Sequence, residues 1–305
     1  MQIDNTIIPV DAKKNTSRVG FALVIFMITF ELFIPVLMQT LAECLHFSYP
    51  DGPTARLLRG TLPIYLVALP IFWASIRKLP KSTPNHRTPD PLWFLILIPI
   101  TLFFMVVGGI IGEGVSDFIA SITSAKVENT SVDAVGRAPI VTQFILAVVI
   151  GPFFEELCFR KLLMDRLMAY SSRNAIILSA VTFAFFHTNI HQFFYAFGIG
   201  IVLAGLYQNT GNLIFPWALH GIANFFGGVF PYILPGRFSN IYYTLYLFVC
   251  ALGLVLLIIF YDDTIRPKDE AGDLPRKATT PAMYLNPGMC TFAVLCILFT
   301  ILSAM

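Results

Sequence analysis

The stretch Gly151–Arg160, GPFFEELCFR, holds the side chains best suited to chemistry in this chain. Glu155 and Glu156 are adjacent carboxylates, and Arg160 follows them inside an otherwise apolar run. A charged side chain at mid-bilayer costs about 2.5–3.5 kcal/mol on insertion scales, so such residues are rare and are candidates for function. Arg160 is expected to offset the paired carboxylates, and it forms an i,i+4 pair of the favourable order with Glu156.

Two further stretches bring polar side chains into apolar runs. His187 ends the segment FAFFH, and His220 and Asn224 lie four residues apart, on one face of a helix. Glu155 lies 16 residues before a turn at Ser171, and His187 lies 16 residues after it. At 1.5 Å per residue both positions are about 24 Å from the turn, so antiparallel helices would place them at similar depth and facing each other.

These residue types suit hydrolysis of an acyl bond by an activated water. Burial in an apolar pocket disfavours the charged form of Glu155 and strengthens it as a general base. His187 can share in orienting the attacking water. His220 and Asn224 can donate hydrogen bonds to the oxyanion of a tetrahedral intermediate. The four residues are therefore the expected catalytic set.

Prolines precede two of these positions by about one turn. Pro152 lies three residues before Glu155, and Pro216 lies four residues before His220. A proline inside a helix removes a backbone hydrogen bond and kinks the chain. Kinks here could open a cavity beside the polar side chains, with the freed carbonyls satisfied by protein or by water.

The same side chains could hold a metal. Glu155, His187 and His220 are of zinc-ligand types, and zinc would then activate the water, so the cofactor is either none or a divalent metal such as zinc. The metalloprotease pattern HExxH is absent, because His187 and His191 enclose no glutamate. The run Gly114–Asp117 matches the short GxSx pattern of rhomboid serine proteases, but four residues match easily by chance.

The composition is that of a polytopic membrane protein. Of 305 residues, 56% are hydrophobic and 12% are charged, which is about half the charged share of soluble domains. The net charge of +2 and the lack of a basic block argue against a nucleic-acid partner. Glu31, in the first apolar run, is expected to pair with a cation elsewhere or to be protonated.

We expect an all-α, polytopic transmembrane helical bundle of about eight or nine spans, because about 20 apolar residues cross the hydrocarbon core as a helix. The expected spans are Val19–Leu41, Leu57–Ile76, Leu92–Ile111, Ile140–Met168, Asn174–Ile190, Gln192–Tyr207, Leu213–Tyr232, Ile241–Tyr261 and a shorter one at Met289–Met305. Lysines and arginines gather before the first span and after the second and the fourth, which predicts a cytoplasmic amino terminus. Small residues in the third and sixth spans are expected to allow close helix packing: Gly108, Gly112, Gly198, Gly200 and Ala204.

The polar residues together resemble the three motifs of a known family. Glu155-Glu156-xxx-Arg160, Phe183-xxx-His187 and His220-xxx-Asn224, in this order, resemble the motifs of the CPBP intramembrane proteases, which include the type II CAAX prenyl proteases and the bacterial Abi proteins. The resemblance implies that Glu155 is the catalytic glutamate and that His187 helps to position the water. It implies an oxyanion-stabilising role for His220 with Asn224, and a supporting role for Glu156 and Arg160. Because the family is described both as metalloproteases and as metal-independent glutamate proteases, it leaves the cofactor open.

The resemblance also implies a location and a division of the chain. A bacterial cell membrane is expected, with the bilayer and a membrane-associated peptide or protein substrate as partners. The expected parts are a cytoplasmic amino-terminal segment (1–18), amino-terminal helices with an external loop (19–138), a CPBP-like catalytic core (139–235), and carboxy-terminal helices (236–305) with a polar cytoplasmic linker (262–287).

Three functions fit these observations. The first is an intramembrane endopeptidase that uses Glu155 as a general base through water. The second is a non-proteolytic membrane immunity or scaffold protein that keeps the same polar site. The third is a proton-coupled transporter, against which the lack of an internal repeat counts, since many transporters show repeated halves.

Overall fold

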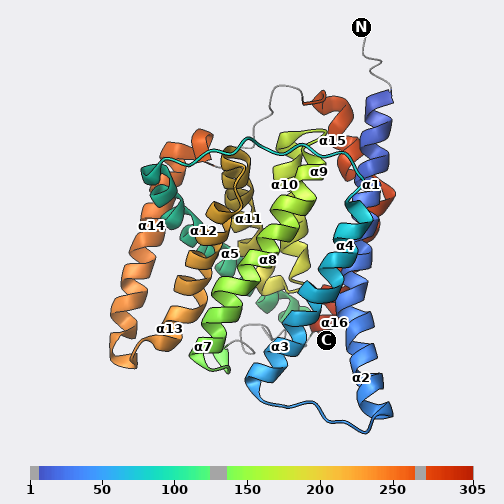
Figure 1. Ribbon diagram of the computed structural model, residues 1–305. Helices are drawn as coiled ribbons and strands as arrows, with labels where there is room; N and C mark the ends of the chain where they lie inside the picture. Colours follow the sequence, from blue (N-terminus) through green and yellow to red (C-terminus); the bar gives the residue numbers. More distant parts are fainter. Residues whose placement is uncertain (1–6, 124–135, 265–272, 305) are drawn as a thin grey trace.

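The computed structural model describes residues 7–123, 136–264 and 273–304, in which every regular element is a helix (Figure 1). The first half contains α1 (Ile7–Ile28), α2 (Ile34–Cys44), α3 (Pro53–Pro63), α4 (Leu69–Ile76) and α5 (Pro91–Thr123). The second half contains α7 (Ile140–Gln143), α8 (Gly151–Glu156), α9 (Asp165–Leu167), α10 (Ser172–Phe186), α11 (Ile190–Thr210), α12 (Ile214–Asn224), α13 (Phe230–Ile233), α14 (Ser239–Thr264), α15 (Arg276–Tyr284) and α16 (Pro287–Ala304). The chain is therefore the all-α helical bundle that the sequence predicts.

Several of these helices are joined end to end by π-helical turns, in which backbone N–H groups reach one residue further back than in an α-helix. These turns are η1 (Thr29–Phe33), η2 (Ile64–Ala68), η3 (Phe144–Ile150), η4 (Leu157–Met164) and η5 (Phe225–Val229). One extra residue in a helix rotates the side chains that follow by about 100°. The π turns therefore decide which side chains of a long helix face the interior.

Six helices in the described residues are long and apolar enough to cross a membrane, or seven if one bent pair counts as a single span. They are Asp11–Cys44, Pro53–Ile76, Pro91–Ile122, Ile140–Leu167, Ile190–Thr210 and Gly236–Asp262, and the bent pair is Lys277–Tyr284 with Pro287–Leu302. This number is lower than the eight or nine spans expected from the sequence.

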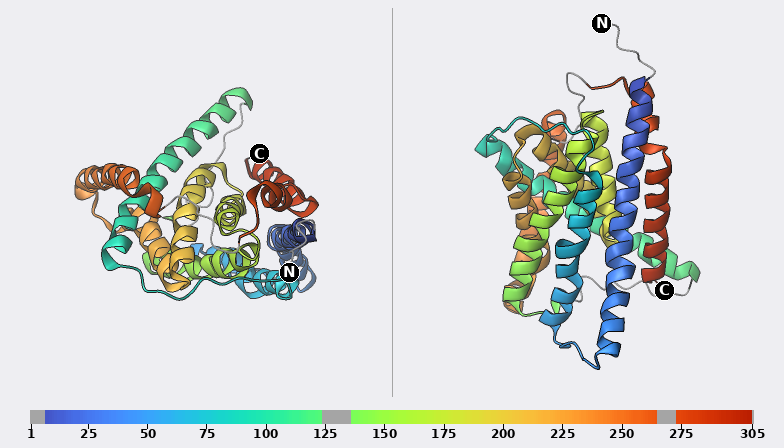
Figure 2. Two further views of the ribbon diagram at one scale, coloured as in Figure 1. Left: turned by 90° about the horizontal axis from the view of Figure 1, so that it is seen from above. Right: turned by 45° about the vertical axis from the view of Figure 1, so that its right-hand side comes forward.

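The difference arises at the fifth and seventh expected spans. Helix α10 is only 15 residues long, and the run through α12, η5 and α13 is not among the candidates. Helix α10 ends early because Thr188 takes a left-handed backbone conformation, with φ of 46°, and the next helix begins at Ile190. A short helix is sufficient at this place because α10 lies inside the bundle, where most of its residues are buried against neighbouring helices (Figure 2).

Aromatic side chains fill the core around α10. The ring of Phe183 lies 5.3 Å from that of Phe159, centroid to centroid, and the ring of Phe186 stacks at 5.3 Å on that of Phe26 in α1. All four rings belong to one hydrophobic cluster or pack against it. The helix that carries His187 is thereby fixed against both α1 and the helix that carries Glu155.

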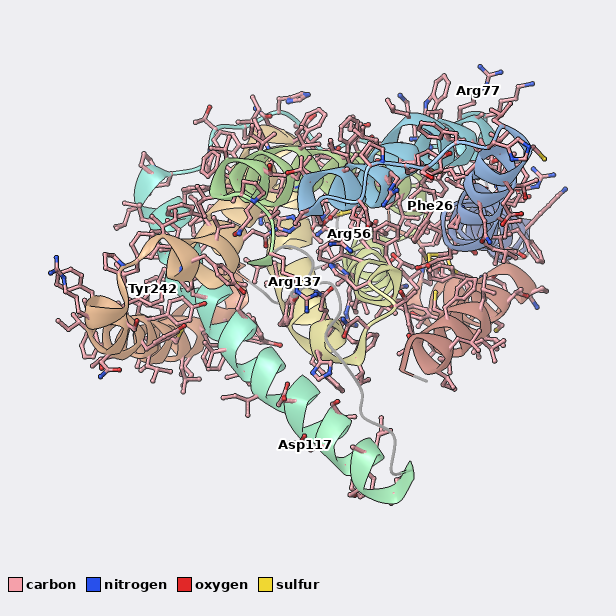
Figure 3. All side chains as sticks on the ribbon, turned by 90° about the horizontal axis from the view of Figure 1, so that it is seen from below. Phe26, Arg56, Arg77, Asp117, Arg137 and Tyr242 are labelled. Atoms are coloured by element: carbon pink, nitrogen blue, oxygen red, sulfur yellow. The ribbon has the colours of Figure 1, made fainter. Side chains whose placement is uncertain are left out.

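Glycines allow α5 and α11 to pack backbone to backbone. A Cβ atom on Gly108 would lie 2.3 Å from the Cα of Tyr195, and one on Gly112 would lie 2.7 Å from the carbonyl oxygen of His191. Any larger side chain would push the two helices apart. The predicted packing role of these glycines is confirmed. Helix α5 has 33 residues, and its last turns, with Asp117, extend away from the rest of the bundle (Figure 3).

The carboxy-terminal region packs beside α1. Thr16 donates a hydrogen bond to the carbonyl of Ala282 in α15 (3.3 Å), and α16 runs alongside α1 (Figures 1 and 2). Part of the expected linker 262–287 is thus the helix α15, while residues 265–272 lie outside the described residues. The expected external loop also falls in part on residues 124–135, which are outside the described residues.

Candidate functional site

Glu155 lies in α8, a short helix held between the π turns η3 and η4. The backbone N–H of Gly151 bonds to the carbonyl of Leu146 instead of that of Ala147, and Pro152 has no N–H to offer. The carbonyl of Ala147 is therefore left without a helical partner. The freed carbonyl that Pro152 was expected to produce is found here, next to Glu155.

Helix α12 supplies the missing hydrogen bonds. The amide Nδ2 of Asn224 donates to the carbonyl of Ala147 at 2.9 Å, and the indole Nε1 of Trp217 donates to that of Val149 at 2.9 Å. Asn224 and Trp217 are seven residues apart and so lie on one face of α12. One N–H of the Asn224 amide is thus used in holding two helices together.

Pro216 does not act as the sequence suggested. It lies in the first turn of α12, which begins at Ile214, and at that position a helix has no internal partner for the N–H that proline lacks. The predicted kink before His220 is therefore wrong, because the helix had not yet begun to make the bond that proline would break.

His220 bridges the two adjacent carboxylates. Its Nδ1 lies 2.9 Å from Oε1 of Glu156, and its Nε2 lies 3.7 Å from Oε2 of Glu155. An ionised carboxylate only accepts hydrogen bonds, so we assign the proton of the shorter contact to Nδ1. The imidazole is held by Glu156 and presents its other nitrogen to Glu155.

Glu156 and Arg160 form a fully buried ion pair. Both side chains are 0% exposed, and Nε of Arg160 lies 2.8 Å from Oε2 of Glu156, a short contact without the alignment of a hydrogen bond. A second guanidinium nitrogen donates to Oε1 of Glu156 (3.2 Å), and the third donates to the hydroxyl of Ser179 in α10 (3.1 Å). The guanidinium also lies 4.9 Å from the ring centroid of Phe183. Arg160 thus neutralises Glu156 and leaves Glu155 as the carboxylate in the cavity.

His187 caps the end of α10. Its Nδ1 lies 2.9 Å from the carbonyl oxygen of Phe183, and since a carbonyl only accepts, Nδ1 is assigned the proton. The lone pair of the neutral ring is then at Nε2. The adjacent Thr188, in its left-handed conformation, donates a hydrogen bond from Oγ1 to Oε1 of Glu31 at 3.1 Å. Glu31, for which the sequence offered no definite partner, thus contacts the turn that follows His187.

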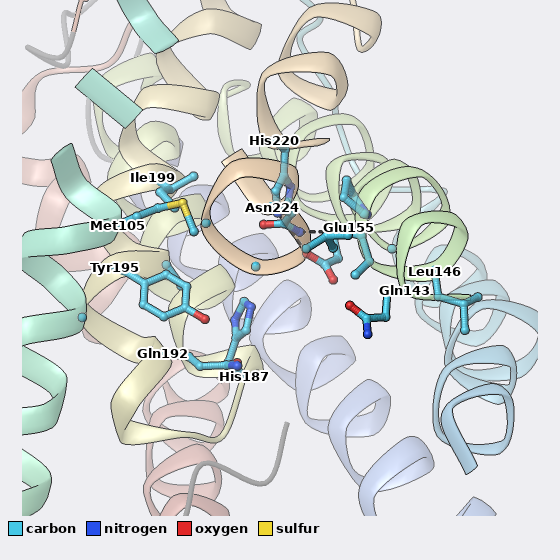
Figure 4. A pocket seen from close by; sticks show the side chains of 18 of the residues that line it. Met105, Gln143, Leu146, Glu155, His187, Gln192, Tyr195, Ile199, His220 and Asn224 are labelled. Atoms are coloured by element: carbon cyan, nitrogen blue, oxygen red, sulfur yellow. Dashed lines mark hydrogen bonds and ion pairs between the residues drawn. The ribbon is translucent and has the colours of Figure 1, made fainter. Parts of the chain in front are cut away.

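All four expected catalytic residues line one cavity of about 740 Å³. Glu155, His187, His220 and Asn224 come from three helical segments and converge on the same space (Figure 4). Glu155 and His187, which were expected at similar depth, both line this cavity. The supporting residues Glu156 and Arg160 lie behind this wall and not in it.

The cavity also contains polar residues that sequence reasoning missed. Gln143 of α7, Gln192 and Tyr195 of α11, and Tyr65 of η2 line it. Gln192 and Tyr195 are three residues apart on one face of the helix that follows His187, and this spacing was the signal that could have identified them. Apolar side chains from α3, α5, η3 and η5 form much of the remaining wall (Leu57, Met105, Ile110, Leu146 and Val229).

The expected zinc ligands do not form a metal site. The described residues contain no group of three or more histidine, cysteine, aspartate or glutamate side chains arranged to hold a metal ion. Nδ1 of His220 and Nδ1 of His187 are bound to other protein atoms, which leaves Nε2 as the nitrogen of each ring that could bind a metal beside Glu155. Glu155, His187 and His220 do not close into one such group in the described residues, and no catalytic step is assigned to a metal.

Ser116 of the GxSx run belongs to a separate hydrogen-bonded cluster, which it forms with His191 and Glu113. Its hydroxyl is 3.1 Å from Nε2 of His191, whose Nδ1 is 2.9 Å from a carboxylate oxygen of Glu113. Ser116 and His191 are buried, and neither lines the cavity of Glu155. These hydrogen bonds link α5 to the start of α11, next to the position where Gly112 packs against the backbone of His191.

Comparisons with known proteins place this segment of the chain next to a family of membrane peptidases. Residues 137–226 match the family model of the type II CAAX prenyl endopeptidase Rce1-like proteins. Among curated proteins, the chain is 27% identical over 169 residues to the "Putative membrane peptidase YdiL" of Bacillus subtilis, covering 53% of this chain and 67% of that protein. It is 28% identical over 114 residues to the "UPF0177 protein YxdF" of Lactococcus lactis, covering 37% of this chain and 62% of that protein. No solved structure matches the chain significantly. The family resemblance seen in the motifs is thus confirmed, and the matched segment contains all six motif residues, Glu155, Glu156, Arg160, His187, His220 and Asn224.

Proposed function

Because residues 137–226 match the family model of the type II CAAX prenyl endopeptidase Rce1-like proteins, we propose that this multi-pass membrane protein is an intramembrane endopeptidase. In this proposal Glu155 activates a water molecule that attacks a peptide bond of a membrane-associated substrate. The single observation that carries the proposal is that the two adjacent carboxylates differ in burial and in pairing. Glu156 is fully buried and paired with Arg160, whereas the side chain of Glu155 is 20% exposed in the cavity.

The contacts around Glu155 suit a general base. Glu155 lines the cavity and is not paired with a lysine or arginine in the described residues, so its carboxylate can accept a proton from a bound water. Glu155 lies beside the imidazole of His220 at 3.7 Å, and that imidazole is anchored by Glu156. His187 presents a lone pair at Nε2 to the same cavity, because its Nδ1–H is bound to the carbonyl of Phe183. Glu155 and His187 can therefore both accept hydrogen bonds from one water and fix its orientation.

The reaction then needs no group beyond the chain and water. As the water oxygen bonds to the substrate carbonyl carbon, its proton passes to Glu155, and the carbonyl electron pair moves onto the carbonyl oxygen. When the tetrahedral intermediate collapses, the C–N bond breaks and the proton on Glu155 passes to the leaving amine. The buried pair of Glu156 and Arg160 holds His220 in place throughout and does not exchange protons with the substrate.

The cavity walls favour an apolar substrate segment. Leu57, Met105, Ile110 and Val229 line the space around the polar groups, so a peptide with aliphatic or aromatic side chains would bury them there. We propose that the substrate is a peptide or protein segment that reaches the site from the membrane.

The decisive experiment compares membranes that contain the wild type with membranes that contain Glu155→Gln. This variant keeps the size of the side chain and removes the base, so peptides released by the wild type should be missing. Glu43→Gln, a change in an exposed carboxylate of α2, is the matched control and should release the same peptides as the wild type. Identical peptides from the wild type and Glu155→Gln would refute the proposal. A cellular function that also survives this substitution would favour a non-proteolytic immunity or scaffold protein.

We further propose that the amino terminus is cytoplasmic. The basic segment that follows α4 lies at the same end of the bundle as the amino terminus (Figure 1). There Ser82 N–H bonds to the carbonyl of Asp165 (2.8 Å) and Arg87 N–H to that of Thr210 (2.7 Å). Loops rich in lysine and arginine stay on the cytoplasmic side. Labelling of single cysteines introduced into this segment, in sealed cells and in inverted vesicles, tests the orientation.

A further inference from the structure

Most of the hydrogen-bond donors that the sequence suggested for the oxyanion are bound to protein atoms. His220 gives its Nδ1–H to Glu156, and its Nε2 faces the carboxylate of Glu155. A neutral imidazole held in this way has no N–H left to donate to a substrate. Donation from Nε2 would require the imidazolium form, in which that proton is attracted to Glu155 itself.

Asn224 is engaged through one of the two N–H groups of its amide, and this bond fixes the orientation of the whole amide. Its Nδ2 donates to the carbonyl of Ala147, which has lost its helical partner to the π turn and to Pro152. Turning the amide towards a substrate would leave that carbonyl unpaired, at a cost of about 1–3 kcal/mol. Asn224 is therefore better placed to hold the wall of the cavity than to move with the reaction.

Tyr195 has a free donor in the same cavity. Its ring enters from α11, on the side opposite Glu155, and its hydroxyl points into the space beside His187 (Figure 4). The hydroxyl has no hydrogen-bond partner within residues 7–123, 136–264 and 273–304. The backbone of Tyr195 is fixed, because Gly108 of α5 packs directly against it. The result is a preorganised O–H donor that faces the general base across the cavity.

We propose that Tyr195 donates the hydrogen bond that stabilises the oxyanion, an assignment that rests on the proposed endopeptidase function. The water attacks from the side of Glu155 and His187, and the carbonyl oxygen turns towards the opposite wall as negative charge develops on it. The Tyr195 hydroxyl donates to this oxygen and keeps its proton throughout. The proton released by the water travels to Glu155 and from there to the leaving amine, so atoms and charge balance without another reactant. A donor fixed before the reaction stabilises the developing charge without having to reorganise.

The test uses Tyr195→Phe, which removes one oxygen atom and leaves the ring. The probe is a synthetic peptide that spans the most abundant Glu155-dependent cleavage found in the membrane comparison. We expect kcat to fall by about 10²–10³-fold, the usual loss for one oxyanion donor, with KM within about threefold of the wild type. Tyr284→Phe makes the same chemical change in α15, outside the cavity, and should keep the wild-type kcat.

A binding measurement separates stabilisation of the transition state from simple substrate binding. In the inactive Glu155→Gln background, the affinity for the peptide should be unchanged by adding Tyr195→Phe. A wild-type kcat in Tyr195→Phe, or an equal loss of affinity and kcat, would overturn the assignment while leaving the endopeptidase proposal intact. Cleavage that persists in Glu155→Gln would instead overturn the proposed function, and the role of Tyr195 with it.

Discussion

The buried pair of Glu156 and Arg160 makes the strongest prediction about stability. Arg160→Met keeps an unbranched side chain of moderate size but removes the charge. Glu156 then loses both of its contacts to the guanidinium, at 2.8 and 3.2 Å, and Ser179 loses a donor at 3.1 Å. Because both charged side chains are 0% exposed, water cannot replace these contacts. Breaking a buried pair on one side costs about 3–5 kcal/mol, and we expect a loss of this size.

The same reasoning predicts that a second substitution recovers part of the loss. In Glu156→Gln/Arg160→Met no unpaired charge remains, and the amide oxygen of the glutamine can still accept from Nδ1 of His220. We expect the double variant to be about 1–3 kcal/mol more stable than Arg160→Met alone, a coupling of the size found for directly contacting residues. The measurement is reversible chemical unfolding in detergent, followed by tryptophan fluorescence. Arg137→Met, at an exposed position, should change stability by less than about 0.5 kcal/mol. A loss below about 1 kcal/mol for Arg160→Met, or a double variant no more stable than it, would refute the electrostatic account.

Two further predictions concern helix packing and the turn beside His187. Gly108→Ala should destabilise the protein by about 1–3 kcal/mol through overpacking, because its Cβ would meet the backbone of Tyr195. Gly114→Ala, where a Cβ would meet nothing within 4 Å, should be neutral or stabilise by up to about 1 kcal/mol; equal effects of these two variants in detergent unfolding would contradict the proposed close contact. Glu31→Leu should lower the free energy of unfolding by about 1 kcal/mol, because it removes the hydrogen bond to Thr188. The loss should be smaller in a Thr188→Gly background, because glycine adopts a positive φ without the support of that hydrogen bond. A double-mutant cycle of unfolding free energies measures this coupling, and additive losses would show that the hydrogen bond does not support the turn.

Much of the site could be predicted from the sequence, because the free-energy cost of a polar side chain in an apolar run depends only on the residues around it in the sequence. A charged or strongly polar side chain in an apolar run costs free energy wherever the helix is placed, so Glu155 and His187 were visible before any fold was known. Their common depth followed from counting residues on either side of Ser171. The i,i+4 pairing of Glu156 with Arg160 also followed from local geometry, and it is found at 2.8 Å.

Only the tertiary structure decided which polar side chains are bound to other protein atoms and which face the cavity with a free donor. The π turns on either side of α8 insert extra residues, so helical spacing counted across them no longer predicts which side chains share a face. Tyr195 was one aromatic residue among many in apolar runs. Which donors are already used and which hydroxyl remains free depend on contacts between distant segments. Sequence spacing along single helices does not contain that information, because the rotation of each helix is set by the helices packed against it.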